Sequence, residues 1–261
     1  MNFSAISRET FLGRMLRLPL RLIPDHAQMR ILQGPLRGKK WIAGSGNHGC
    51  WLGSYEYAKQ KAFAAAVCAG DIVYDLGANV GFYSLLASVL AGPQGRVYSF
   101  EPVPENLDFL RKHLAMNQVT NCVIFALAVS DSRGTANFAF GLDSCSGGLR
   151  AGSGNSMAVQ TVALDDMVAA GEILAPSVIK CDIEGGEFAA LKGAARTLVA
   201  AAPKIFLATH GQEAHQRCCK FLSDLGYTLT SLDEHPLDFS SEILAVPHQK
   251  RVGAAVRSVE R

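Results

Sequence analysis

From about Lys59 onward, short apolar runs alternate with segments long enough to form helices. This alternation is typical of parallel β-α-β units, in which each strand is followed by a helix that packs back on the sheet. The sequence therefore predicts an α/β fold with a doubly wound, seven-stranded, mainly parallel sheet that ends in an antiparallel edge. The expected strands cover residues 72–76, 96–100, 123–128, 177–183, 204–209, 227–232 and 242–246. A single helix is expected over 187–201, and Asp165 is expected to cap the helix that follows residues 159–163.

The chain is expected to divide into three parts: an N-terminal extension or lid (1–57), a ligand-binding domain (58–250) and a short tail (251–261). Within the extension, residues 34–38 predict a turn between two short strands. Residues 11–24 interleave arginines with leucines, without the run of about 18 uncharged apolar residues that a membrane span needs. This segment is expected either to pack on the domain or on a second copy of the chain, or to lie on an anionic membrane surface.

The composition is that of a globular protein, with 49% hydrophobic and 18% charged residues. A formal net charge of +2 over 261 residues gives no field that would attract nucleic acid. The seven cysteines are odd in number and form no C-x-x-C pair, which argues against a disulfide framework and against a zinc site. We expect a protein of the reducing cytoplasm.

The strongest local motif covers residues 73–81, where a predicted strand ends at Asp75 and a Gly-rich turn leads into a helix. The glycines Gly77 and Gly81 are spaced G-x-x-x-G rather than G-x-G-x-x-G, and the turn carries no lysine or arginine, so a dinucleotide is disfavoured. A carboxylate at this place suits a ligand that bears an ammonium and a sulfonium. Glu101 ends the next strand, where an acidic side chain can accept hydrogen bonds from ribose hydroxyls.

Five motifs in order resemble those of FkbM-type methyltransferases: DLGANVG (75–81), FEPVPEN (100–106), AVSD (128–131), LDD (164–166) and IKCDIEG (179–185). The resemblance runs from about residue 72 to 211. It implies a class I methyltransferase fold, S-adenosylmethionine as methyl donor, and O-methylation of sugars or other secondary metabolites. It also implies cofactor contacts from Asp75, Gly77, Asn79 and Glu101. To these we add Gly81, Ala128 and Asp182 as expected cofactor-binding residues.

The same resemblance shows one departure at the fifth strand. Members of the family often carry a glutamate two residues before the histidine of this motif, whereas this chain has Ala208 before Thr209 and His210. A mechanism that needs a carboxylate at position 208 is therefore in doubt.

Three residues at the carboxyl ends of strands are candidates for the base that takes the acceptor proton: Asp182, Glu184 and His210. The two acids alternatively stabilise a helix N-terminus or hold the cofactor, and the histidine alternatively serves as a structural hydrogen-bonding group. Asp182 and Glu184 offer the oxygen ligands that Mg²⁺ prefers. Two clustered oxygen ligands are too few to assign a metal, so none is assigned.

The methyl acceptor is expected to be a small molecule, contacted by His48, Trp51, Tyr55 and Glu56 as a lid. Core packing of Trp51 is an equal alternative. The Gly- and Ser-rich stretch 141–156 is either a mobile acceptor loop or a surface insertion. Three other functions stay open: an NAD(P)-dependent oxidoreductase or epimerase, an RNA methyltransferase, and a binding module without catalysis. Whether the chain forms a homo-oligomer also stays open.

Overall fold

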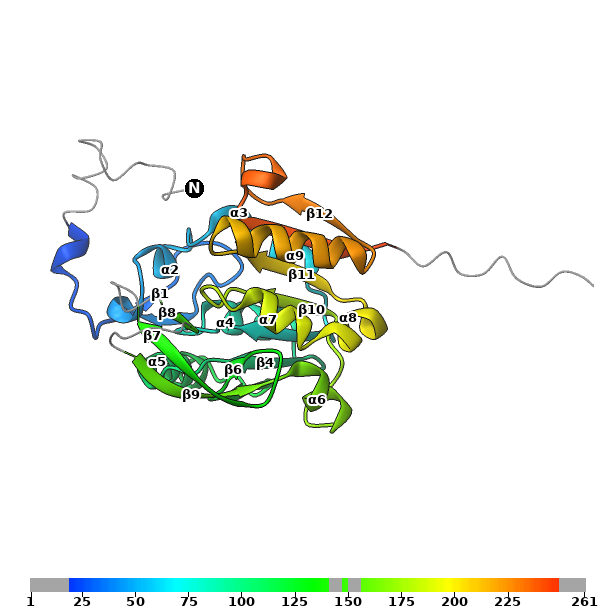
Figure 1. Cartoon of the computed structure of the whole chain (residues 1–261). Coiled ribbons are helices and arrows are strands. Elements are labelled where there is room, and N and C mark those ends of the chain that lie inside the picture. The colour runs from blue at the N-terminus through cyan, green and yellow to red at the C-terminus, as the bar shows by residue number, and fades with distance from the viewer. Residues whose placement is uncertain (1–18, 141–146, 150–155, 249–261) are drawn as a thin grey trace, which may run out of the picture.

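A seven-stranded sheet forms the centre of the computed structural model, which describes residues 19–140, 147–149 and 156–248 (Figure 1). The strand order is β12-β13-β11-β10-β3-β4-β5. β13 runs antiparallel to its neighbours β11 and β12, and the other neighbouring strands are parallel. The predicted sheet is thus confirmed. Its strands are β3 (Ile72–Leu76), β4 (Arg96–Phe100), β5 (Cys122–Phe125), β10 (Val178–Cys181), β11 (Lys204–Ala208), β12 (Tyr227–Ser231) and β13 (Glu242–Pro247).

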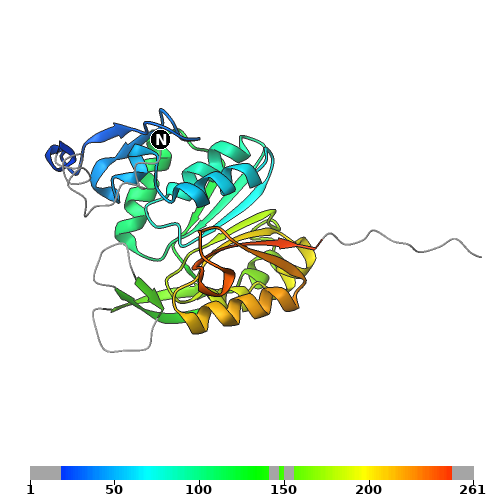
Figure 2. The same ribbon diagram turned by 90° about the horizontal axis from the view of Figure 1, so that it is seen from above.

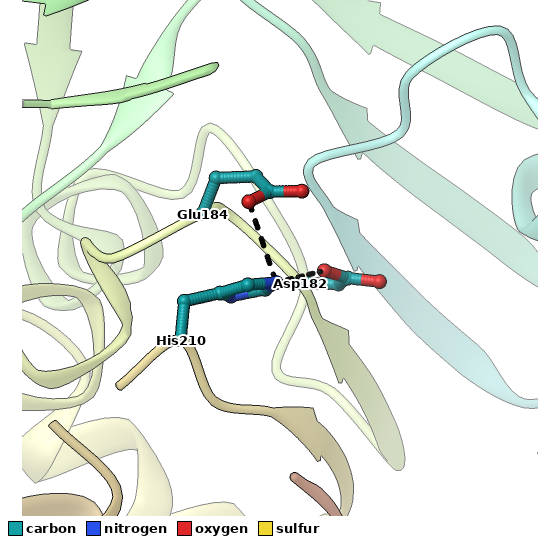
Figure 3. A group of neighbouring side chains, drawn as sticks. All are labelled: Asp182, Glu184 and His210. Atoms are coloured by element: carbon teal, nitrogen blue, oxygen red, sulfur yellow. Dashed lines mark ion pairs between the residues drawn. The ribbon is translucent and has the colours of Figure 1, made fainter. Parts of the chain in front are cut away.

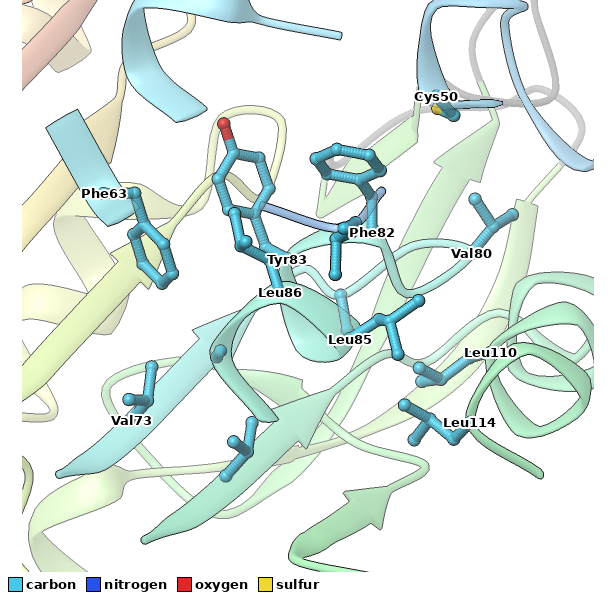
Figure 4. Close-up of a cluster of buried hydrophobic side chains, with 14 of the residues drawn as sticks. Cys50, Phe63, Val73, Val80, Phe82, Tyr83, Leu85, Leu86, Leu110 and Leu114 are labelled. Atoms are coloured by element: carbon cyan, nitrogen blue, oxygen red, sulfur yellow. The ribbon is translucent and has the colours of Figure 1, made fainter. Parts of the chain in front are cut away.

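Helices cover both faces of this sheet (Figure 2). One face is covered by α3 (Tyr57–Ala66), α4 (Phe82–Ala91) and α5 (Pro104–Met116). The other is covered by α6 (Leu164–Ala169), α7 (Glu187–Lys192), α8 (Ala195–Ala201) and α9 (Gln212–Asp224). Consecutive strand residues belong to opposite faces, so Val73 lies in the same core cluster as Phe63 and Leu85 (Figure 4), while Tyr74 lies in the second core. Both faces of the strands are therefore buried, as in other doubly wound sheets.

A second, four-stranded sheet lies beside the main one and was not predicted as a sheet. Its order is β6-β9-β7-β8, with β6 (Ala128–Val129), β7 (Gly134–Phe140), β8 (Gly147–Leu149) and β9 (Ser156–Val162). The strand expected over 123–128 is divided, because β5 ends at Phe125 and Ala128 pairs with Thr161 of β9. Of the expected loop 141–156, residues 141–146 and 150–155 lie outside the described residues.

Two local predictions about helices were wrong. The single helix expected over 187–201 is interrupted between α7 and α8, where a Cβ atom on Gly193 would lie 2.1 Å from the backbone oxygen of Ser130. Asp165 does not cap α6, because its carboxylate accepts the backbone N–H groups of Arg196 and Thr197 at 2.9 and 2.8 Å. Asp165 thus satisfies free donors at the start of α8 instead.

The N-terminal part is fixed to the main domain by aromatic packing. The predicted turn at 34–38 is confirmed, since β1 (Gln28–Arg30) pairs antiparallel with β2 (Lys40–Ile42). Trp41 of β2 is fully buried and stacks on His113 of α5, with ring centroids 3.7 Å apart. Short helical turns complete this part and the loop before β13: η2 (Pro19–Leu22), η3 (Ala43–Ser45), α2 (Gly49–Leu52) and η4 (Leu237–Phe239).

Two of the sequence-based expectations fall on residues outside the described ranges. These are most of the arginine- and leucine-rich segment, residues 11–18, and the tail over 251–261. The boundary at residue 57 stays a prediction. Among the helices of the described ranges, none has the length and apolar character needed to span a bilayer.

Candidate functional site

A cavity of about 330 Å³ opens at the carboxyl ends of the parallel strands, a size within the range of about 300–1,000 Å³ found for small-molecule sites. It is bordered by the loops that follow β3, β4, β10 and β11. The strand order reverses here, because β3 is flanked by β4 on one side and by β10 on the other. Open α/β sheets bind their ligands at such a reversal point.

The loop after β3 is shaped by close backbone contacts. Gly77 has φ +75°, and a Cβ atom there would lie 2.0 Å from the backbone oxygen of Asp182. Asn79 also adopts a left-handed backbone, with φ +50°. Its N–H donates to Glu101 Oε2 at 2.7 Å, and its side-chain oxygen accepts the N–H of Val80. Gly77 and Asn79 both line the cavity, so the loop offers it a fixed backbone surface.

Glu101 lies at the end of β4, lines the cavity and is only 4% exposed. Its Oε1 accepts the N–H of Val103 at 2.9 Å and the amide of Asn106 at 3.2 Å. Burial raises the pKa of this carboxyl group, although its hydrogen bonds act in the opposite direction. Each carboxylate oxygen has two lone pairs, so Glu101 has capacity for a further hydrogen-bond donor, and its contact with a ribose hydroxyl stays a prediction.

Asp75 is placed differently from the expectation. It is buried beneath the loop and is not among the described residues that line the cavity. Its Oδ1 lies 3.3 Å from Nζ of Lys180, and its Oδ2 accepts the hydroxyl of Ser84 at 2.6 Å. Lys180 also donates to the backbone oxygen of Gly77 at 2.8 Å. The argument that an unpaired Asp75 attracts a cationic ligand is therefore corrected, because Lys180 compensates its charge.

Asp182, Glu184 and His210 come together at the ends of β10 and β11 (Figure 3). His210 Nε2 lies 3.7 Å from Asp182 Oδ1 and 3.4 Å from Glu184 Oε2. Its other nitrogen, Nδ1, is 2.7 Å from Oε1 of Glu187, whose side chain is completely buried. This bond to Glu187 is the main reason why the pKa of His210 is raised. Glu184 adopts a left-handed backbone with φ +57°, a type of strain often found at functional sites.

The three side chains Asp182, Glu184 and His210 also offer donor atoms that a divalent cation could use. One ligand atom from each lies within 4.8 Å of the others. The set is two carboxylates and one imidazole, which suits several divalent ions. The sequence suggested only the two carboxylates as ligands.

A buried lysine connects three acidic residues on another side of the cavity. Nζ of Lys59 lies 2.7 Å from Glu56 Oε2, 2.8 Å from Glu242 Oε1 and 3.5 Å from Asp182 Oδ2, and the lysine is only 4% exposed. Burial alone would raise the pKa of Asp182, but Lys180, Lys59 and His210 together hold it below its ordinary value. Asp182 is therefore an anion at neutral pH and a weak base.

The remaining predicted residues divide into two groups. Tyr55, Glu56 and Ala128 line the cavity. Trp51 is instead 3% exposed within the first core, and its Nε1 donates to Nδ1 of His48 at 3.2 Å. Neither Trp51 nor His48 is among the described cavity residues, so the lid expected from these two is not found there.

Gly81 lies behind the loop as the N-cap of α4, with φ +93°. Among the described residues, Gly81 is not one of those that line the cavity.

Sequence reasoning missed four charged residues of the site: Lys59, Lys180, Glu187 and Glu242. Lys180 had a signal, because a lysine inside the apolar strand 178–181 must have a partner when it is buried. Lys59 and Glu242 are separated by 183 residues and gave no local signal.

Comparison with known proteins gives a consistent result. The family model described as the methyltransferase FkbM domain matches residues 75–229, more than half of the chain. Hexuronic acid methyltransferase AglP of Haloferax volcanii is 30% identical, over 49% of this chain and 52% of that protein. The 31-O-demethyl-FK506 methyltransferase FkbM of Streptomyces tacrolimicus is 29% identical, over 48% of this chain and 59% of that protein. The chain thus spans between half and three fifths of these curated relatives.

A crystal structure of methyltransferase FkbM from Methylobacillus flagellatus KT superimposes with a TM-score of 0.50 at 17% identity. The match covers 77% of this chain and 55% of that one. At this level of identity the likeness shows a common fold.

Proposed function

Since this chain belongs to the FkbM methyltransferase family, we propose that it methylates a hydroxyl oxygen of a sugar or a related polyhydroxylated secondary metabolite. Membership of this family supports S-adenosylmethionine-dependent methyl transfer over the NAD(P)-dependent oxidoreductase alternative and the non-catalytic alternative. The names of the two relatives refer to a hexuronic acid and to 31-O-demethyl-FK506. These names support a small-molecule acceptor for this chain as well.

The observation that carries the oxygen assignment is the bond between His210 and Glu187. His210 lines the cavity. When its Nδ1–H is donated to the buried Glu187 carboxylate, the lone pair of the neutral imidazole lies on Nε2. A hydroxyl needs such a base to become a good nucleophile, and a positioned base contributes about 10²- to 10⁴-fold. The arrangement follows the same logic as other base-and-orienting-acid pairs.

We assign the cofactor to the part of the cavity formed by Gly77, Asn79, Glu101, Ala128 and Asp182. When bound there, S-adenosylmethionine supplies an electrophilic methyl group. Glu101 would accept hydrogen bonds from the ribose hydroxyls, and the backbone at Gly77 and Asn79 would face the nucleoside. Asp75 and Lys180 act from below by fixing the loop.

In the proposed reaction, the chain would hold the acceptor oxygen about 3 Å from the methyl carbon and in line with the bond between that carbon and the sulfonium sulfur. That C–S bond would break as the C–O bond forms, with S-adenosylhomocysteine as the leaving group. His210 Nε2 takes the proton of that hydroxyl as the new C–O bond forms. The imidazolium that results is stabilised by Glu187 on one side and by Asp182 and Glu184 on the other. The proposal assigns no step to a metal ion.

A transfer assay with radiolabelled S-adenosylmethionine tests this proposal. The panel contains methyl glycosides of a neutral hexose, a 6-deoxyhexose and a hexuronic acid, a hydroxylated macrolide, and total RNA. Each reaction is run with EDTA and with Mg²⁺, so that a metal-dependent transfer is not missed. We expect label in the ether-linked product of a hydroxylated small molecule. Label in RNA, or in no member of the panel, would contradict the proposal.

Two variants separate the base from the cofactor site. His210→Asn should lower kcat by about 10²- to 10⁴-fold, while the control His235→Asn changes an exposed residue and should leave it unchanged. Glu101→Ala should weaken calorimetric binding of the cofactor at least about tenfold, or 1.4 kcal/mol. The control Glu105→Ala removes an exposed acid in the first turn of α5 and should bind normally.

A further inference from the structure

Glu242 lies at the start of β13, directly opposite Ala208 of β11 in the antiparallel register. Directly opposed residues of antiparallel strands point to the same face, with Cβ atoms about 4.5–5.5 Å apart. Both residues line the cavity. Because the side chain of Ala208 ends at Cβ, the carboxylate at this point of the cavity comes from the neighbouring strand.

Glu242 is held both at its carboxylate and at its backbone. Its Oε1 accepts a hydrogen bond of 2.8 Å from Lys59, which is itself paired with Glu56 at 2.7 Å. Its backbone N–H donates to Oγ of the buried Ser240 at 3.1 Å, and that hydroxyl donates to the backbone oxygen of Glu242 at 2.8 Å. A side chain fixed in this way is pre-organised for binding rather than free to rotate.

The second oxygen of Glu242, Oε2, has no such bond. It is buried, and no hydrogen-bond donor among the described residues reaches it. A buried acceptor without a donor costs free energy, and the cost is removed when a ligand supplies the donor. Thr209, His210 and Ser241 line the same cavity, so a ligand at Glu242 would share the cavity with the proposed base.

We propose that Glu242 binds the methyl acceptor, its carboxylate accepting a hydrogen bond from a second hydroxyl group of the acceptor, with Lys59 as the positioning residue. This inference rests on the proposed function, because it requires a hydroxylated acceptor. It narrows the substrate class to molecules with at least two hydroxyl groups, one that is methylated and one that is bound. Glu242 thereby supplies the carboxylate that the side chain of Ala208 lacks.

The test compares five proteins on the panel member that the wild-type enzyme methylates: wild type, Glu242→Ala, Glu242→Gln, the relocated pair Ala208→Glu with Glu242→Ala, and the control Glu234→Gln. We expect Glu242→Ala to raise the acceptor KM at least tenfold, with kcat changed less. Affinity for S-adenosylhomocysteine, measured by calorimetry, should stay within twofold. Glu242→Gln should be intermediate, and the relocated carboxylate should recover part of the lost affinity. Glu234 is exposed in the loop before β13, and its substitution should change nothing.

Monodeoxy analogues of that acceptor identify the bound hydroxyl. One analogue should bind wild type at least tenfold more weakly and yet bind Glu242→Ala as well as the parent acceptor does, which is the signature of a direct pair in a double-mutant cycle. An unchanged KM in Glu242→Ala would overturn the inference and leave the proposed function intact. Equal losses of acceptor and S-adenosylhomocysteine affinity in both Glu242 variants would also overturn it, by showing a structural role. If wild type methylates no panel member, the proposed function itself fails.

Discussion

Nζ of Lys180 lies 3.3 Å from Oδ1 of Asp75, and both side chains are almost completely buried beneath the loop that follows β3. The same ammonium donates to the backbone oxygen of Gly77 and lies 5.6 Å from the ring centre of Tyr83. Asp75, the first residue of the Gly-rich motif, therefore acts through Lys180, and the pair fixes the backbone that borders the cavity.

Lys180→Met should destabilise the protein by about 3–5 kcal/mol, because removing one partner leaves a buried carboxylate uncompensated. Adding Asp75→Asn should recover part of this loss. The control Lys192→Met removes an ion pair of 3.1 Å with Asp131 in which both residues are exposed, so it should cost less than about 1 kcal/mol. Urea unfolding measures all three. Equal small losses for Lys180→Met and Lys192→Met would show that the buried pair does not stabilise the loop.

Gly77→Ala should be far more damaging than Gly70→Ala, although both glycines have positive φ. A Cβ atom on Gly77 meets a backbone oxygen at 2.0 Å, whereas one on Gly70 meets nothing within 4 Å. Left-handed backbone alone costs an L-residue about 1–2 kcal/mol, and this should be the whole loss for Gly70→Ala. We expect Gly77→Ala to lose more stability and also cofactor binding, measured by thermal unfolding and calorimetry. Similar losses for the two variants would mean that the Asp182 loop moves away without cost.

Asp165→Ala should destabilise the protein by about 0.5–2 kcal/mol through loss of the cap on α8. Burial alone would raise the pKa of Asp165, but hydrogen bonds from Thr197 and Arg196 hold it below its ordinary value. A lowered pKa stabilises the fold above the unfolded-state pKa near 3.9, and this contribution is lost as the pH falls through the folded-state pKa. The difference in the free energy of unfolding between wild type and Asp165→Ala should therefore be greatest at neutral pH and become smaller in strong acid. Asp166→Ala, at an exposed residue, is the control.

Local signals explain which parts of this structure the sequence predicted. The strand at 72–76 and the loop after it follow from one continuous stretch of residues, and they were found where expected. Asp165 was misassigned because its partners lie 31 and 32 residues away, while a cap for α6 was the nearer possibility. Lys59 and Glu242 meet only because β13 is inserted between β11 and β12. Strand order, and not residue pattern, brings these two charges together.

The titration of His210 tests the proposed base without any acceptor. Glu187 Oε1 accepts both from His210 Nδ1 at 2.7 Å and from the N–H of Gly185 at 2.8 Å. In Glu187→Gln the amide oxygen can keep both bonds, so the substitution removes the charge and preserves the geometry. Because Glu187 is the main cause of the raised pKa of His210, that pKa should fall in the variant. NMR of the imidazole resonances measures it, with exposed His235 as the internal reference.

Glu187→Gln should also shift the pH dependence of the rate of methyl transfer. A base acts only when it is neutral, so the wild-type rate should rise with pH through the raised pKa of His210, and the rise should begin at lower pH in Glu187→Gln. A raised folded-state pKa stabilises the fold below the unfolded-state value of about 6.5, and this contribution is lost as the pH rises through the folded-state pKa. The stability difference between the two proteins should therefore be largest in mild acid. If the His210 resonance moves in the variant while the rate profile does not, another group takes the proton.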